Sequence, residues 1–275
     1  MPGIVNHREM GKAVYNELPP HIAEEITEDI FNIALFASDP YSFYRFIEIP
    51  FKFGINRRSS VMHAYHTADF LVELARRSRS DKKMFSYLAG YLCHFALDSD
   101  AHPYINKRAS NIGGMHMAIE NRLDVITLKR LGKPLSRRPI TKEYFPAFIP
   151  RSMRKDLNRI ARKLYGWDDH WEKLGTGYRY MKLFVFLAED PAGLVRATVG
   201  RLKKPADGKL AAMSYRSRMC DNMEFDEFDD LVKKAVADAK RYIETAYAYR
   251  EGRISIEVFR GMIGTKDYSG NELQF

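Results

Sequence analysis

The sequence lacks the features that mark disulfide-stabilised, membrane-spanning and secreted proteins. Only two of its 275 residues are cysteines, Cys93 and Cys220, which is too few for a disulfide framework. It has no apolar run of about 18 residues, the length that a transmembrane helix needs. Its N-terminus has no basic segment followed by an apolar block, so no signal peptide is expected. The sequence therefore predicts a cytoplasmic protein.

Signals for β-strands are also scarce. Alternation of apolar and polar residues is confined to short pieces such as residues 253–258. In most long segments, apolar residues instead recur near the helical period of 3.6, which predicts helices. The expected helices span residues 23–36, 59–74, 81–97, 112–131, 151–164, 178–188, 192–202 and 225–250. We therefore predict a single all-α, multi-helix domain over residues 1–275, with long connections at residues 132–150 and 203–222.

The net charge of +9 indicates what kind of partner the protein attracts. An anionic substrate or surface, such as a phosphodiester, a nucleic acid or an anionic membrane, would be drawn to it. Basic residues cluster at residues 76–79, 137–138 and 151–163. Each cluster is equally well explained as the solvated face of a helix, so the charge alone locates no binding site. Nothing in the sequence indicates an obligate protein partner.

Histidines are few, eight in all, yet five of them fall between residues 63 and 116. Neutral imidazoles and ionised carboxylates together suit Zn²⁺ and related ions. Residues four apart lie on one face of a helix, so one helix can offer both members of such a pair to a metal. About one His/acid pair at this spacing is expected by chance, whereas three occur. They are His21/Glu25, His94/Asp98 and His116/Glu120.

Each pair also has a plainer explanation. Glu25 follows a helix start, where its charge can simply favour the helix dipole. Asp98 lies in an otherwise apolar segment, where an ionised carboxylate is costly unless it is paired or bound to a metal. A buried hydrogen bond to His94 would satisfy it without any metal. Gly90, one turn before His94, would allow a neighbouring helix or a ligand to approach closely. Asp124 lies one turn after Glu120, so the third pair can also be explained as part of a solvated acidic face of a helix.

The order of these residues resembles the bacterial zinc-dependent phospholipase C family, whose fold is shared with fungal single-strand-specific nucleases. The family pattern is an early His, an Asp, a Met-His pair, His-x3-Asp, a His before a Pro or a loop, and His-x3-Glu about fourteen residues later. The matching residues are His7, Asp39, His63 after Met62, His94, Asp98, His102 before Pro103, His116 and Glu120. The resemblance covers residues 1–130, the metal-site half, and residues 131–275 are expected to complete the helical domain. His66 has no place in the pattern.

The resemblance implies two or three zinc ions. The first would be held by Asp39, His63, His94 and Asp98, and the second by His102, His116 and Glu120. The third would share Asp98 and use His7 together with the N-terminal residue. The secreted relatives have a Trp at a processed N-terminus, whereas this chain begins with Met1-Pro2, so the third site is left open.

The implied activity is hydrolysis of a phosphodiester, either phospholipid or nucleotide, by a metal-bridged hydroxide. Asp39 is the candidate catalytic carboxylate that orients or deprotonates the water. Asp100 and Asp124 are candidates for orienting the ligating imidazoles. Tyr41, Phe43 and Tyr65 flank the predicted ligands and could form an aromatic wall for a head-group cation or a base, although packing in the core explains each of them as well. The alternatives are a nuclease or nucleotidase on the same scaffold, and a non-catalytic helical protein that binds metal.

Overall fold

A computed structural model of the chain describes residues 3–47, 53–110, 112–135, 141–190, 192–193 and 212–272. These residues form helices, and their only β-type pairing is an isolated bridge between Lys266 and Glu272. The prediction of an all-α fold is confirmed. The α-helices are α1 (Ile4–Glu17), α2 (Pro20–Ala23), α3 (Glu28–Ala34), α4 (Phe53–Ala64), α5 (Thr67–Ser78), α6 (Lys82–Ala109), α7 (Met115–Arg130), α8 (Arg154–Tyr165), α9 (His170–Glu189), α12 (Phe228–Arg250) and α13 (Ile256–Ile263). Short 3₁₀ helices are η1 (Asp39–Phe43), η2 (Thr141–Tyr144) and η3 (Arg151–Met153).

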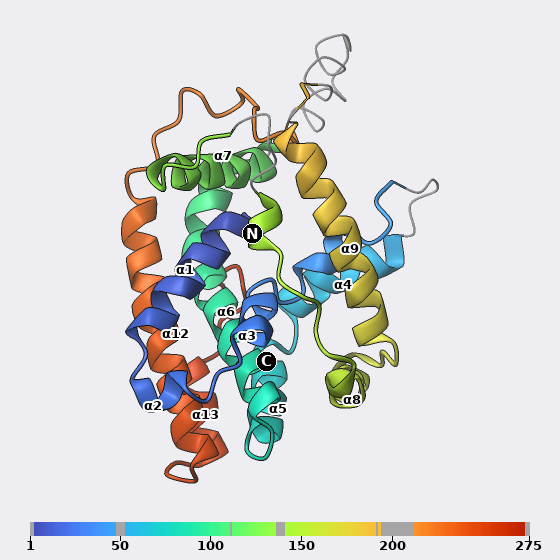
Figure 1. The fold of residues 1–275 in the computed structure, drawn as a ribbon, viewed down its shortest axis with the longest axis vertical. Helices are drawn as coiled ribbons and strands as arrows, with labels where there is room; N and C mark the ends of the chain where they lie inside the picture. Colours follow the sequence, from blue (N-terminus) through green and yellow to red (C-terminus); the bar gives the residue numbers. More distant parts are fainter. Residues whose placement is uncertain are drawn as a thin grey trace.

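Helix α6 runs through the centre of the molecule, and α1, α3, α5, α7 and α12 pack against it (Figure 1). Its first turn is capped by the carboxylate of Asp81, which accepts hydrogen bonds from the N–H groups of Lys83 and Met84. Most of its side chains are buried, as expected for a helix that is apolar on all sides. It continues through Pro103 well beyond the predicted end at residue 97.

Gly90 is the point where α3 crosses α6. A Cβ atom at this position would lie 2.2 Å from the backbone oxygen of Phe31 and 2.8 Å from the Cβ of Ala34. The side chain must therefore be absent for the two helices to approach this closely. The expectation of a close neighbour at Gly90 is confirmed, and the neighbour is a helix.

The structure differs from the predicted helices at one split segment and at one additional helix, each for an identifiable reason. The segment 59–74 is split between α4 and α5 because His66 adopts the left-handed conformation, with a φ of 56°. Helix α1 was not predicted because its buried face includes the polar side chains of Asn6 and His7 and so shows no apolar stripe. Residues 194–202 of the predicted helix over residues 192–202 lie outside the described residues, as do residues 203–211 of the predicted connection over residues 203–222.

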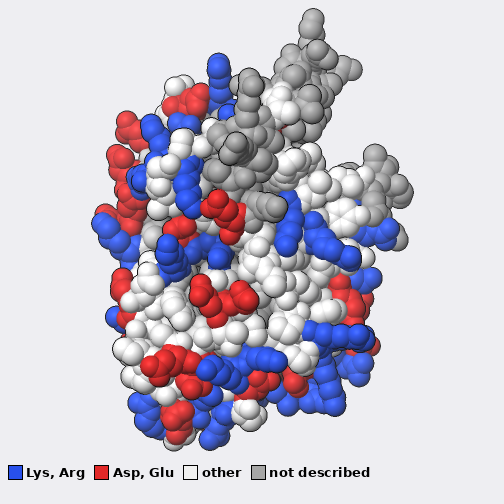
Figure 2. All heavy atoms as spheres, viewed as in Figure 1, with Lys and Arg blue, Asp and Glu red and all other residues white. Residues whose placement is uncertain are grey.

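Basic and acidic side chains are interspersed over the face shown in Figure 2. In the cluster over residues 151–163, Lys163 pairs with Glu73 of α5 at 2.8 Å, and Arg154 pairs with Glu172. The charges of this cluster are thus partly matched by neighbouring helices. The cluster at residues 137–138 lies outside the described residues. Among the helices that the structure describes, none is long and apolar enough to cross a membrane.

Candidate metal centre

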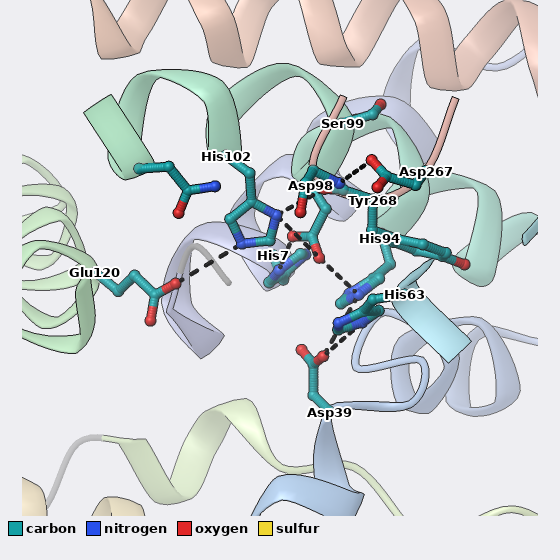
Figure 3. Close-up of polar contacts among 12 residues, drawn as sticks. His7, Asp39, His63, His94, Asp98, Ser99, His102, Glu120, Asp267 and Tyr268 are labelled. Atoms are coloured by element: carbon teal, nitrogen blue, oxygen red, sulfur yellow. Dashed lines mark hydrogen bonds and ion pairs between the residues drawn. The ribbon is translucent and has the colours of Figure 1, made fainter. Parts of the chain in front are cut away.

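Three elements bring together the first predicted group of ligands (Figure 3). Asp39 begins η1, His63 lies in the last turn of α4, and His94 and Asp98 lie one turn apart on α6. One ligand atom from each of the four residues lies within 4.8 Å of the others. Asp39 Oδ1 is 3.3 Å from His63 Nε2 and 3.6 Å from His94 Nε2. This spacing suits one metal ion coordinated by all four.

The second group lies between α6 and α7. His102 comes from α6, one turn after Asp98, while His116 and Glu120 come from the first turns of α7. Their ligand atoms also lie within 4.8 Å of one another. Glu120 Oε1 is 2.6 Å from His116 Nε2 and 3.9 Å from His102 Nε2. The crossing of α7 over the end of α6 therefore assembles a second compact set of nitrogen and oxygen donors.

Asp98 and His7 connect the two groups. Asp98 Oδ2 is 3.2 Å from His94 Nε2 and 3.9 Å from His102 Nδ1, so the carboxylate adjoins both groups. Asp98 Oδ1 is 3.3 Å from Nε2 of His7, whose ring stacks on His94 at a centroid distance of 4.3 Å. The remaining predicted partner of His7, the N-terminal residue, lies outside the described residues.

The imidazoles are oriented by groups that the sequence did not reveal. His94 Nδ1 lies 3.0 Å from the backbone oxygen of Leu35, and His102 Nδ1 lies 2.7 Å from that of Tyr268. An Nδ1–H that donates to a carbonyl leaves the Nε2 lone pair available for a metal. His116 Nδ1 lies 2.9 Å from Asn106 Oδ1. Asn106 follows His102 by one turn, so its spacing could have been noticed, whereas a distant backbone carbonyl leaves no sequence signal.

Asp100 and Asp124, predicted to orient imidazoles, make other contacts. Asp100 Oδ1 lies 2.5 Å from Lys234 Nζ on α12. The buried carboxylate of Asp124 accepts hydrogen bonds from the backbone N–H groups of Val5 and Asn6, at 3.2 and 3.0 Å. Asp124 therefore caps the start of α1 and acts on His7 only through that helix. The prediction of direct contact with a ligating ring is corrected for both residues.

Several buried atoms of the first group and of His7 lack a hydrogen-bond partner within the described part of the chain. They are Asp39 Oδ1, both carboxylate oxygens of Asp98, and the Nε2 atoms of His7, His63 and His94. Folded proteins rarely leave buried polar atoms unsatisfied, so a group of them aimed at one point calls for a ligand. Imidazole nitrogens with carboxylate oxygens are the donors that zinc prefers. The residues present thus fit metal ions.

The protonation states of the rings follow from burial and from the carboxylates. Burial disfavours the His94 cation, but the charges of Asp39 and Asp98 outweigh it and raise the pKa of His94 to about 9. Burial lowers the pKa of His7, and it lowers the pKa of His116 to about 4. At neutral pH, His7 and His116 therefore carry the neutral form that binds metals, and a metal at the first group would displace the His94 proton.

A pocket of about 1120 Å³ opens beside both groups. Asp39, His63, His102, His116 and Glu120 contribute to its lining. Its other walls are mainly apolar and include Phe36, Phe43, Phe46, Met117, Met181 and Phe184. Residues of both groups therefore border a space that suits a substrate with a large apolar part.

The two tyrosines predicted to bind substrate do not line this pocket. Tyr41 is fully buried, and its hydroxyl lies 2.9 Å from His170 Nδ1. Tyr65 is 63% exposed. Of the three aromatic residues predicted to form a wall, Phe43 lines the pocket, together with Phe36, Phe46, Phe184 and Tyr215.

Comparison with known proteins agrees with this geometry. The model of the family described as zinc dependent phospholipase C matches residues 14–173, which is more than half of the 275 residues. No curated protein and no solved structure is significantly similar to the chain. The family match shows that the chain belongs to the zinc-dependent phospholipase C family.

Proposed function

We propose that this member of the zinc-dependent phospholipase C family hydrolyses a phosphodiester bond of a phospholipid. One observation carries the proposal. Buried imidazole nitrogens and carboxylate oxygens of the first group and of His7, which make no hydrogen bond within the described residues, converge beside an open and mainly apolar pocket. Two zinc ions are supported by the two ligand groups, and a third would depend on His7.

Zinc held by these residues would neutralise charge on a phosphoryl oxygen and lower the pKa of a bound water. Of the carboxylates in the two groups, Asp39 and Glu120 line the pocket, whereas Asp98 is not part of its lining. We assign to Asp39 the role of accepting the proton of the attacking water, because it belongs to the four-residue group and faces the substrate space. Asp98 would connect the two groups, since its Oδ2 adjoins both and its Oδ1 adjoins His7.

The walls of the pocket favour a lipid over a nucleic acid. No Lys or Arg occurs among the described residues that line it. A nuclease needs cations on the phosphates as well as faces on which bases stack. Phenylalanine and methionine side chains instead suit the apolar part of a diacylglycerol leaving group. This supports the phospholipid over the nuclease or nucleotidase alternative.

The test combines metal analysis with hydrolysis by the purified protein. We expect at least two equivalents of zinc, together with hydrolysis of a chromogenic phosphodiester that carries a phospholipid head group. His94→Ala should lose at least one equivalent of zinc and about 100-fold or more in activity. His66→Asn is the matched control, since His66 is exposed, its side chain contacts Asp69 and Tyr165, and Asn tolerates its positive φ.

Unchanged zinc content in His94→Ala would refute the metal assignment. Full zinc content without hydrolysis of any phosphodiester would favour the non-catalytic alternative. Faster hydrolysis of single-stranded nucleic acid than of phospholipid would favour the nuclease.

A further inference from the structure

The outer face of α9 carries large apolar side chains that point into solvent. Its inner residues, such as Met181, Phe184 and Val185, are buried against the core. On the opposite side, Phe186 is 48% exposed, and Leu183 and Leu187 are each 38% exposed. Since both sides are apolar, the pattern is not that of a helix covering a core with its polar side outward. Clustered exposed apolar residues usually mark a binding surface.

The charges on this face have one sign. Arg179 and Lys182 are exposed beside the three apolar residues. The only acidic residues of α9 are Glu172, in its first turn, and Glu189, which is buried at its last residue. In Figure 2, the region over the upper part of α9 shows uncharged and basic side chains, and acidic ones appear at its lower end. Apolar side chains flanked by cations are the pattern of helices that lie on anionic lipid.

A second hollow, of about 610 Å³, is lined by Arg179 and Leu183 of this face. Ile47, which is 55% exposed, lines both this hollow and the large pocket. The hollow therefore borders the outer face of α9 on one side and the wall of the large pocket on the other. A lipid that leaves a bilayer at this face would have a short path to the ligand groups.

We propose that the outer face of α9 (Arg179, Lys182, Leu183, Phe186 and Leu187) docks on the surface of an anionic lipid bilayer. The apolar side chains insert among the head groups, and the two cations contact lipid phosphates. The route into the pocket depends on the proposed function, whereas the docking itself does not.

The test is co-sedimentation with large vesicles of phosphatidylcholine mixed with phosphatidylglycerol. The wild-type protein should bind these vesicles, and added salt should weaken the binding. The double variant Phe186→Ser/Leu187→Ser should bind at least ten-fold more weakly, because two apolar side chains no longer leave water. Arg179→Gln should weaken binding to vesicles that contain phosphatidylglycerol and leave binding to pure phosphatidylcholine vesicles unchanged. Val258→Ser on α13, which removes a side chain that is 53% exposed, is the matched control and should bind as wild type.

Two further measurements keep the interpretation separate from folding and from catalysis. The double variant should keep its zinc and its hydrolysis of a short, water-soluble phosphodiester, since neither residue lines the pocket. Equal sedimentation of wild type and double variant would overturn the docking proposal. The docking proposal would also be overturned if the wild type formed a dimer in light scattering and the double variant lost the dimer but still bound vesicles. Vesicle binding without hydrolysis would leave the docking intact and refute the proposed function.

Discussion

Asp124 illustrates how one buried carboxylate can position a helix and, through it, a candidate ligand. It accepts hydrogen bonds from the first turn of α1, from the Asn6 side chain at 2.7 Å and from the Tyr215 hydroxyl at 3.0 Å. A Cβ atom on Gly3 would overlap the carboxylate, which shows how tightly the start of α1 is seated on α7. His7 lies at the end of that first turn and thus owes its place beside Asp98 to a residue on another helix.

Asp124 also predicts a dependence of stability on pH. Burial raises its pKa to about 6, above the usual 3.8, so the folded protein holds this proton more tightly than the unfolded chain does. The resulting stability is present below about pH 4 and is lost as the pH rises to about 6. Relative to Asp124→Asn, the free energy of unfolding of the wild type should fall by up to roughly 3 kcal/mol over this interval. Denaturant titrations of both proteins in EDTA would measure it, and parallel pH curves would contradict it.

At the scale of the element, the crossing of α3 and α6 depends on Gly90. Replacing a helical glycine by alanine normally stabilises a helix by about 0.5–1 kcal/mol. Gly90→Ala should instead destabilise the protein by about 1–3 kcal/mol, because the new methyl would overlap the Phe31 carbonyl. Gly261→Ala in α13 is the control, since nothing lies within 4 Å of the added atom, and it should show the normal gain. Equal effects of the two substitutions in chemical denaturation would show that the crossing can relax.

The elements also show what the sequence could and could not predict. The apolar period of α6 and the spacing of His94 to Asp98 are local, so both could be read from the chain. The break at His66 could not, because most histidines adopt a negative φ even though histidine is enriched at positive φ relative to most residues. His170 is flanked in the sequence by Asp169 and Trp171, and nothing in that stretch indicates that its ring is buried against Tyr41. Contacts of that kind depend on which elements meet in space.

At the scale of the whole molecule, the two ligand groups tie together elements that are distant in the sequence. The ligands come from η1, α4, α6 and α7, and His7 adds α1. Because the unfolded chain cannot present them together, metal binding stabilises the folded state. The proposal of one domain over residues 1–275 is consistent with this, since α12 from the second half packs along α6.

Chelation should therefore lower thermal stability. A metal bound a thousand-fold above its dissociation constant contributes about 4 kcal/mol, and each kcal/mol corresponds to roughly 2–4 °C for a protein of this size. We expect EDTA to lower the Tm by about 10 °C and added zinc to restore it, measured by circular dichroism. His94→Ala should respond less to EDTA than the wild type does. An unchanged Tm in EDTA would show that the ligand groups hold no stabilising metal.

The segment after α13 gives the candidate metal centre a further property. The N–H of Tyr268 donates to the carbonyl of His63, and its own carbonyl lies against His102 Nδ1. Its ring is buried against the rings of His63 and His94. The centre thus draws on positions from 7 to 268. During synthesis, these parts can meet only after the segment that follows α13 has left the ribosome, so the complete centre would form later than the synthesis of α6 and α7, which carry most of its ligands.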